Sequence, residues 1–149
     1  MIIREAIKDD AGQIAAFQLA MAMETENFQL DINLVSKGVQ RVFEEPAKGT
    51  YYVAEKNGKV IASLLTTFEW SDWRNGTILW IQSVYVSPEF RRNGIYKNMY
   101  RHILQLVAEN LEFKGVRLYV DHTNLPARQV YKKLGMNSEH YQLFEWLKD

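Results

Sequence analysis

A short basic turn, Arg91-Arg92-Asn93-Gly94, separates a stretch that predicts a buried strand from one that predicts a long helix. The strand stretch, Thr77 to Val86, is apolar, β-branched and aromatic, and Pro88 ends it because proline has no N–H for a strand ladder. The first N–H groups of a helix have no acceptor inside it and lie at the positive end of its dipole. A glycine in the turn lets an anion approach these groups. Strand, turn and helix together predict a phosphate-binding site.

A second stretch that could carry chemistry runs from Asn124 to Gly135. Pro126 in its first turn and Gly135 at its end predict a short helix. Asn124 is a good N-cap for that helix, and Tyr131 has apolar neighbours that suit a core position.

Composition limits the classes of function. With 149 residues, the chain has the size of one domain, which we predict to span residues 1–149. Lys+Arg and Asp+Glu balance at 18 each, so broad nucleic-acid binding is not expected, although a local basic site is compatible with that balance. The absence of cysteine excludes disulfides, zinc–thiolate sites and thiol nucleophiles. We expect no metal site, no membrane association and no signal peptide, and therefore a cytoplasmic protein.

The elements that position the two polar stretches follow from hydrophobic periodicity and turn residues. Asp9 or Asp10 is expected to cap the first helix, and Asn57-Gly58 is expected to turn a hairpin. A strand, a helix and a further strand around the basic turn imply a parallel pair. Strands are predicted at 1–6, 49–55, 59–70, 77–86, 115–121 and 137–147, with helices that begin near 10, 32, 95 and 124. The order β-α-α-β-β-β-α-β-α-β predicts an α/β fold with a mixed sheet and helices on both faces.

That order and the two polar stretches resemble the GNAT superfamily of acetyl-CoA-dependent N-acetyltransferases. The family's phosphate signature is Arg or Gln, two residues, Gly, one residue, then Gly or Ala, and here it reads Arg91-Arg92-Asn93-Gly94-Ile95-Tyr96. Tyr96 stands where a small residue is usual, so its side chain must point away from a bound phosphate. The second signature reads Asn124-Leu-Pro-Ala127-Arg-Gln-Val-Tyr131. The resemblance covers essentially the whole chain, and it implies the acyl-CoA N-acyltransferase fold with acetyl-CoA as cosubstrate.

The resemblance also implies roles for individual residues. The N–H groups from Arg92 to Lys97 would bind the pyrophosphate, and the strand edge from Ser83 to Val86 would pair with the pantetheine arm. A backbone N–H near Val84 would stabilise the reacting thioester oxygen, Asn124 would hold the arm, and Tyr131 would protonate the departing sulfur. The implied catalytic residues are Tyr131 and Val84. The implied cofactor-binding residues are Val84, Tyr85, Val86, Arg91, Arg92, Asn93, Gly94, Ile95, Tyr96, Lys97, Asn124 and Tyr131.

Deprotonation of the acceptor amine is the step that most needs a catalytic group. An alkyl amine of pKa about 10.4 is mostly protonated at neutral pH and costs roughly 4–5 kcal/mol to deprotonate, whereas a thiol of pKa about 8.5 leaves readily. Many family members carry a glutamate where this chain has Gln82, and glutamine cannot act as a base. The base is therefore open among a water held by the backbone and Gln82, the carboxylates Glu24, Glu26 and Glu69, and His122.

The loops that wall the acceptor pocket in this family combine acidic and aromatic residues here. Such loops suit a cation through ion pairing and cation–π attraction, although ordinary hydrophilic loops have the same composition. We predict a small, cationic primary amine as acceptor, bound by Glu24, Glu26, Phe28, Trp70, Asp72 and Gln82. The rival hypothesis is a catalytically weak acyl-CoA-binding sensor or structural protein of the same fold. The aromatic tail, with Tyr141, Phe144 and Trp146, either seals the core or pairs with a second copy in a homodimer.

Overall fold

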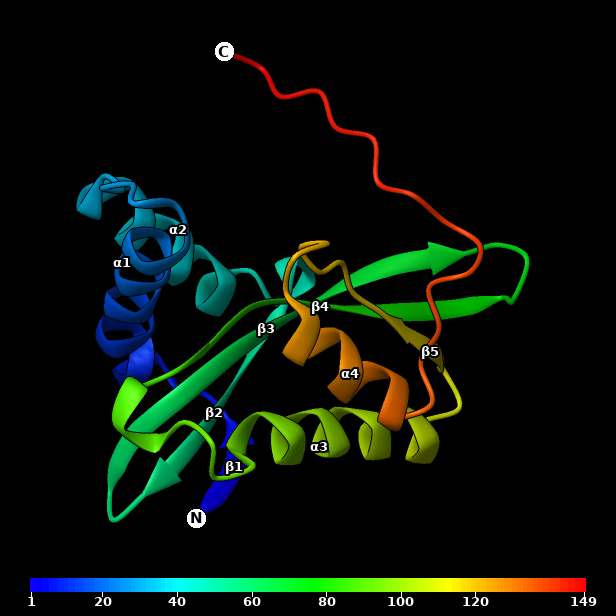
Figure 1. Cartoon of the computed structure of the whole chain (residues 1–149), viewed down its shortest axis with the longest axis horizontal. Coiled ribbons are helices and arrows are strands. Elements are labelled where there is room, and N and C mark those ends of the chain that lie inside the picture. The colour runs from blue at the N-terminus through cyan, green and yellow to red at the C-terminus, as the bar shows by residue number, and fades with distance from the viewer. The chain divides into compact units, whose positions relative to one another are not determined.

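Strands of β-branched and aromatic residues assemble into a five-stranded sheet in the order β1-β2-β3-β4-β5 (Figure 1). The computed structural model describes all 149 residues, and these strands lie in the first of its two units, Met1–Arg117. Neighbouring strands are antiparallel except β4 and β5, which are parallel. The mixed sheet predicted from the sequence is thereby confirmed, although β5 begins and ends earlier than expected. The strands span Ile2–Glu5, Thr50–Lys56, Lys59–Ser71, Gly76–Val86 and Phe113–Arg117.

Tight turns join the strands of the antiparallel meander. Asn57 and Gly58, between β2 and β3, have φ angles of 51° and 76°. A two-residue hairpin needs this left-handed pair because it matches the right-handed twist of the flanking strands. The turn between β3 and β4 closes with the N–H of Arg74 donating to the Ser71 carbonyl at 3.2 Å. The hairpin expected at Asn57-Gly58 is therefore present.

Helices cover both faces of the sheet (Figure 1). They are α1 (Ala11–Glu26), α2 (Ile32–Glu44) and α3 (Ile95–Glu109). Tyr52 projects to the opposite face from its neighbours on β2, because side chains alternate along a strand, and its ring centre lies 5.7 Å from that of His102 on α3. The sheet thus has an α1/α2 face and an α3 face. The core on the α1/α2 face is formed by Ile14, Ala15, Val39, Tyr51, Val53 and Leu65.

The two aspartates at the starts of α1 and α2 behave differently. Asp31 caps α2, and its Oδ1 accepts from the N–H groups of Asn33 at 2.9 Å and Leu34 at 3.3 Å. Asp10 makes no such cap for α1, contrary to expectation. Its Oδ2 instead accepts from Arg4 Nη1 at 2.8 Å, and the hydrogen bond from Arg4 lowers the pKa of Asp10. Arg4 of β1 therefore binds the Asp10 carboxylate, which the sequence pattern had indicated as a cap of α1.

The second unit, Leu118–Asp149, contains one regular element, α4 (Leu125–Lys133). Gly135 follows α4 with a φ of 86°, and the N–H of Met136 donates to the Tyr131 carbonyl at 3.0 Å, as expected of a glycine that ends a helix. The strand predicted at 137–147 is absent, and the observed order is β-α-α-β-β-β-α-β-α. A strand exists only where a neighbouring strand takes its N–H and C=O groups, and the tail has no such partner. None of the four α-helices has the length and apolar character needed to cross a membrane.

Candidate functional site

Strand β4 contains a β-bulge at Ser83, where β4 has one residue more than β3. Gln82 pairs with Leu65 and Tyr85 pairs with Ser63, so two residues of β4 stand opposite one residue of β3. Ser83 has a φ of 54°, a left-handed conformation that is uncommon outside glycine and typical of such irregularities. Because the extra residue shifts the alternation, the side chains of Gln82 and Tyr85 both lie on the α1/α2 face with Leu65.

The parallel strands β4 and β5 part before β4 ends. Their pairing runs from Thr77 with Phe113 to Trp80 with Arg117, whereas β4 continues to Val86. On the β5 side, the backbone of β4 beyond Trp80 therefore meets no strand of the first unit. Such a free edge can accept an extended ligand as an added strand, through the same N–H and C=O groups that would pair with a neighbour.

The basic turn that follows β4 contains N–H groups that have no acceptor in the backbone. The N–H groups of Arg92, Asn93 and Gly94 donate to no backbone carbonyl, and the first helical bond of α3 is from Asn98 to the Gly94 carbonyl at 3.0 Å. Arg92 and Gly94 have φ angles of 66° and 73°. The side-chain amide of Asn93 fixes this shape by donating to the carbonyls of Phe90 at 3.1 Å and Arg91 at 3.2 Å. The turn is thus preformed, with the geometry of an anion-binding nest.

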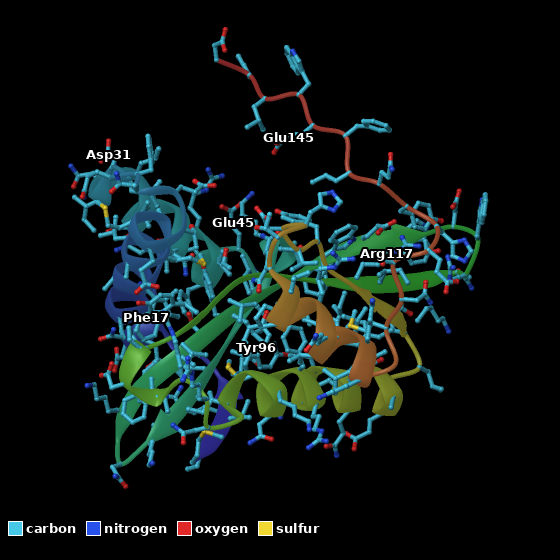
Figure 2. The ribbon with its side chains drawn as sticks, viewed as in Figure 1. Phe17, Asp31, Glu45, Tyr96, Arg117 and Glu145 are labelled. Carbon is cyan, nitrogen blue, oxygen red and sulfur yellow. The ribbon has the colours of Figure 1, made fainter.

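The side chain of Tyr96 runs along α3 rather than over the turn. Its hydroxyl lies 3.1 Å from that of Tyr100, one helical turn further on, and the two ring centres are 4.7 Å apart (Figure 2). Tyr100 is only 1% exposed, so it offers a fixed surface to the Tyr96 ring. The bulky residue at this position of the phosphate signature is therefore compatible with an open turn.

Glu24, near the C-terminal end of α1, is hydrogen-bonded to two residues that are distant in sequence. Its Oε1 accepts from the Tyr85 hydroxyl at 2.9 Å, and its Oε2 accepts from Arg91 Nη2 at 2.8 Å. Arg91 also donates through Nε to the Val86 carbonyl at 2.8 Å, and its guanidinium carbon lies 5.2 Å from the centre of the Tyr85 ring. Phe17 of α1 packs on the same ring, with ring centres 5.1 Å apart (Figure 2). Glu24, Tyr85 and Arg91 form the Glu24 cluster.

The Glu24 cluster fixes the charge state of its carboxylate. The hydrogen bond from Arg91, and after it the one from Tyr85, lowers the pKa of Glu24. Burial, and after it the hydrogen bond to Glu24, raises the pKa of the Tyr85 hydroxyl. At neutral pH the carboxylate is therefore ionised and the phenol protonated, and a carboxylate of lowered pKa is a weak base.

A second carboxylate on the α1/α2 face has the same kind of partners. Glu69 Oε1 accepts from the indole Nε1 of Trp80 at 2.7 Å, and both carboxylate oxygens lie 2.9 Å from Arg117 Nη1, at the end of β5 (Figure 2). The hydrogen bond from Trp80, followed by that from Arg117, lowers the pKa of Glu69. Glu69, Trp80 and Arg117 form the Glu69 cluster. It joins β3, β4 and β5 at the last residue pair before β4 and β5 part.

The second unit holds the second polar stretch. Asn124 caps α4, with its Oδ1 accepting from the N–H of Ala127 at 3.2 Å, which confirms the structural interpretation of this residue. The cap leaves the amide nitrogen of Asn124 available for other contacts. Tyr131 lies on α4 and is buried, and the exposed His122 precedes the helix, where its carbonyl accepts from Arg128 Nη1 at 3.1 Å.

Residues 15–136 match the model of the acetyltransferase (GNAT) family. This chain belongs to that family. A solved structure of a possible acetyltransferase from Clostridium difficile 630 is 40% identical, with a TM-score of 0.92 over 99% of this chain and 97% of that one. A predicted acetyltransferase from Clostridium acetobutylicum, solved with acetyl-CoA, is 18% identical, with a TM-score of 0.74 over 97% and 95% of the two chains. The ribosomal-protein-alanine N-acetyltransferase from Brucella melitensis biovar Abortus 2308 is 14% identical, with a TM-score of 0.78 over 99% of both chains. Among curated proteins no sequence matches this one.

This GNAT protein brings together only some of the residues that its sequence suggested. The strand edge and the turn are continuous in the chain, and Arg91 joins them. The residues expected to bind the acceptor do not form one cluster: Glu26 and Phe28 are exposed at the end of α1, and Asp72 lies in the β3–β4 turn. Trp70 pairs with Thr77 and so lies on the α3 face, opposite the face of Gln82.

Proposed function

We propose that this GNAT acetyltransferase transfers an acetyl group from acetyl-CoA to the primary amine of a small, cationic acceptor, by direct attack in a ternary complex. The observation that carries the proposal is the continuity of the free β4 edge, from Ile81 to Val86, with the turn whose N–H groups lack backbone acceptors. Acetyl-CoA has an extended arm followed by a pyrophosphate, and these match a strand edge followed by an anion-binding turn. The acetyltransferase of the same fold from Clostridium acetobutylicum was solved with this ligand.

The roles proposed for the first unit follow from this placement. The N–H groups from Arg92 to Lys97 bind the pyrophosphate, and the edge from Ser83 to Val86 pairs with the pantetheine arm. The bulge supports a special role for the N–H near Val84, because the extra residue is removed from regular pairing with β3. That N–H stabilises the charge that develops on the thioester oxygen.

The roles proposed for the second unit come from the family signature. Asn124 uses its amide nitrogen to hold the pantetheine arm, and Tyr131 protonates the departing sulfur. We propose that residues 1–149 act as one domain, since the family model spans 15–136 and so includes parts of both units. In thermal unfolding, a single cooperative transition with the same midpoint by tyrosine and by tryptophan fluorescence would support one domain. Two separate transitions would contradict it.

The proton of the acceptor amine is proposed to leave through a water held by Gln82. Glu24 and Glu69, two of the candidate bases, are each hydrogen-bonded to an arginine and have lowered pKa values. Gln82 lies on the same face between them. Ser63, opposite Tyr85 across the bulge, has a fully buried hydroxyl without a hydrogen-bond partner, which is a polar contact point for such a water.

The acceptor is proposed to bind on the α1/α2 face, where α1 contacts β4 and where Gln82 projects. The support for a cationic molecule is the exposed Glu26 and Phe28 at the end of α1, which combine a carboxylate with an aromatic ring. Neither glutamate of the two clusters is a free anionic site, because each already has a guanidinium partner. The negative charge available to a small amine therefore comes mainly from Glu26. Replacing Glu26 by Gln together with Phe28 by Ala should raise the KM for the amine.

An amine panel tests the proposed activity. Release of free thiol from acetyl-CoA would be measured with amino acids, polyamines and amino sugars, and acetylated products would be identified by mass spectrometry. We expect turnover on at least one small cationic amine, with a lower kcat in Tyr131→Phe and Gln82→Ala. Turnover only on peptide N-termini would contradict the acceptor proposed.

The rival function, an acyl-CoA-binding sensor, is favoured by the lack of an evident general base. Glu24 and Glu69 form ion pairs with arginines, and Gln82 stands where many family members have a glutamate. Calorimetry with acetyl-CoA separates the two functions. Binding of acetyl-CoA without turnover on any amine of the panel would favour the sensor over the transferase.

A homodimer formed through the tail is proposed as the functional assembly. Tyr141, Phe144 and Trp146 are 77%, 89% and 87% exposed. Each aromatic side chain buries roughly 150–250 Å² when covered, so a reciprocal exchange of two tails would cover an area near the lower limit of a stable interface. β5 is an edge strand with one free side for such a tail. Light scattering should give a dimer for the full chain and a monomer after Tyr141, Phe144 and Trp146 are changed to Ser; a monomeric full chain would contradict the proposal.

A further inference from the structure

Glu24 is bonded to both parts of the proposed donor site. Tyr85, which donates to Glu24 Oε1, belongs to the free edge of β4, and Arg91, which donates to Glu24 Oε2, begins the phosphate turn. Arg91 donates in addition to Val86, the last residue of β4. One carboxylate on α1 therefore connects the end of the strand to the start of the turn.

The segment that the Glu24 cluster spans has few other restraints. Ser87 is anchored to β3, with its N–H donating to the Ile61 carbonyl at 2.9 Å. The 3-10 turn Pro88–Phe90 has local bonds, from Phe90 to Ser87, from Arg91 to Pro88 and from the Asn93 amide to Phe90, and the Phe90 ring centre lies 5.8 Å from Lys56 Nζ. Lys59 approaches Glu89 at 3.8 Å between exposed side chains, which restrains little. The bonds of Arg91 to Val86 and Glu24 are thus the main connection between strand and turn.

We propose that Glu24 is a positioning residue: it fixes the separation between the β4 edge and the phosphate turn, so that one acetyl-CoA molecule can occupy both. The inference rests on the proposed function, because it takes the edge and the turn as the two halves of the donor site. It assigns Glu24 neither the role of base nor that of acceptor ligand. Both of its oxygens are engaged, and its charge is balanced by Arg91.

The contribution of this cluster to folding stability is small, which makes the positioning role testable. The side chains of Glu24 and Arg91 are 39% and 43% exposed, and ion pairs this exposed stabilise a fold by only about 0–1 kcal/mol. A ligand that binds two linked subsites, by contrast, gains its full affinity only when their spacing matches the ligand. Loss of Glu24 should therefore affect binding of the whole ligand more than the fold.

The experiment compares acetyl-CoA with its two halves. S-acetylpantetheine carries the arm without the pyrophosphate, and 3′-phosphoadenosine 5′-diphosphate carries the pyrophosphate without the arm. Dissociation constants would be measured by calorimetry for acetyl-CoA and by NMR titration for the weaker halves, for the wild type and Glu24→Gln. We expect Glu24→Gln to weaken acetyl-CoA binding about tenfold, the lower end of the effect that loss of a hydrogen bond to a charged group gives, and to change the affinity for either half less than twofold.

The matched control is Glu45→Gln. Glu45 pairs with Arg41 at 3.2 Å on the surface of α2, with side chains 50% and 61% exposed, so the same charge is removed without touching the site. This control should leave all three affinities unchanged. The direction of the change in affinity gives a further check on Glu24→Gln. Removal of a negative charge near a pyrophosphate would by itself strengthen binding of the nucleotide half, whereas loss of positioning weakens binding of acetyl-CoA.

The outcomes separate this inference from the function on which it rests. If wild-type protein binds acetyl-CoA no more tightly than its better half, the two-part donor site fails. If the wild type gains affinity from linkage and Glu24→Gln retains all of that gain, the positioning role of Glu24 is overturned while the proposed function stands. Equal weakening of the whole ligand and of one half would also overturn it, because it would indicate a direct contact rather than control of spacing.

Discussion

Two clusters of the same composition flank Gln82 on the α1/α2 face. Each has a glutamate that accepts hydrogen bonds from an aromatic residue of β4 and from an arginine: Tyr85 and Arg91 for Glu24, Trp80 and Arg117 for Glu69. In both, these contacts lower the pKa of the glutamate. The same three kinds of side chain therefore interact at two places along β4. The two clusters differ in the elements that they connect.

The Glu69 cluster connects neighbouring strands, and the Glu24 cluster connects elements that are distant in the chain. Glu69, Trp80 and Arg117 lie on β3, β4 and β5, and Trp80 pairs directly with Arg117 at the last position before those two strands part. Glu24 is 61 residues from Tyr85 and 67 from Arg91, and its cluster reaches the basic turn that begins at Arg91. The Glu69 cluster lies where β4 and β5 part. The Glu24 cluster lies where the end of β4 meets the basic turn.

The largest expected difference between the clusters follows from replacing each arginine by lysine. Arg91→Lys keeps the charge but loses the planar fork that reaches both the Val86 carbonyl and Glu24, so the affinity for acetyl-CoA should fall about tenfold. Arg117→Lys makes the same change in the Glu69 cluster and should leave that affinity within about twofold, since Arg117 binds Glu69 beside Trp80, before the free edge of β4 begins. Calorimetry with acetyl-CoA measures both. Equal losses would show that the two clusters are not functionally distinct.

A smaller effect is expected from the aromatic donors. Tyr85→Phe removes only a hydroxyl and should reduce acetyl-CoA affinity about threefold, with a loss of roughly 0.5–1.5 kcal/mol in unfolding free energy, because Glu24 keeps Arg91. Trp80→Phe removes the N–H bonded to Glu69 and part of the ring; it should reduce the unfolding free energy by about 1–2 kcal/mol and leave donor affinity unchanged. Urea unfolding and calorimetry on the same samples give both quantities. A fall in donor affinity only in Trp80→Phe would reverse the assignment.

The sequence was sufficient for elements whose signals are local. The basic turn, the Asn57-Gly58 hairpin and the end of α4 at Gly135 each depend on residues within a few positions of one another. The clusters depend on register and on packing between distant segments. Glu24 was recognised as a candidate for chemistry, but nothing near it in the sequence indicates that Arg91 neutralises it. Arg117 was missed entirely, because a single arginine inside a predicted strand has no distinguishing local pattern.

The failures of prediction share one physical cause, dependence on a partner outside the local sequence. Asp9 or Asp10 was expected to cap α1, but the carboxylate of Asp10, which directly precedes the helix, binds Arg4 instead. The tail has the aromatic composition of a strand, yet a strand needs a neighbour, and unit Leu118–Asp149 contains no strand. The bulge at Ser83 has no Gly or Asn to announce it, and its positive φ is imposed by the pairing of β4 with β3.

The smallest expected effect is a difference in pH dependence. Both Glu24 and Glu69 have pKa values below their ordinary value of 4.5, so each favours the folded protein above the pKa of an unfolded glutamate. That contribution is lost as the pH falls through the lower folded value. Because both side chains are more than a third exposed, the change in unfolding free energy should be small for both, and similar in Glu24→Gln and Glu69→Gln.

Donor binding should distinguish the two carboxylates over the same interval. Protonation of Glu24 removes its ion pair with Arg91, so acetyl-CoA affinity in the wild type should decline as the pH falls below 4.5, the ordinary value, through the lower pKa of Glu24 in the folded protein. Glu24→Gln should lack this decline, since its side chain has no proton to gain, whereas Glu69→Gln should retain it. Calorimetry at a series of pH values, with folding verified by circular dichroism at each, provides the measurement. If Glu69→Gln removed the decline and Glu24→Gln kept it, the control of strand-to-turn spacing would belong to the point where β4 and β5 part, not to the end of α1.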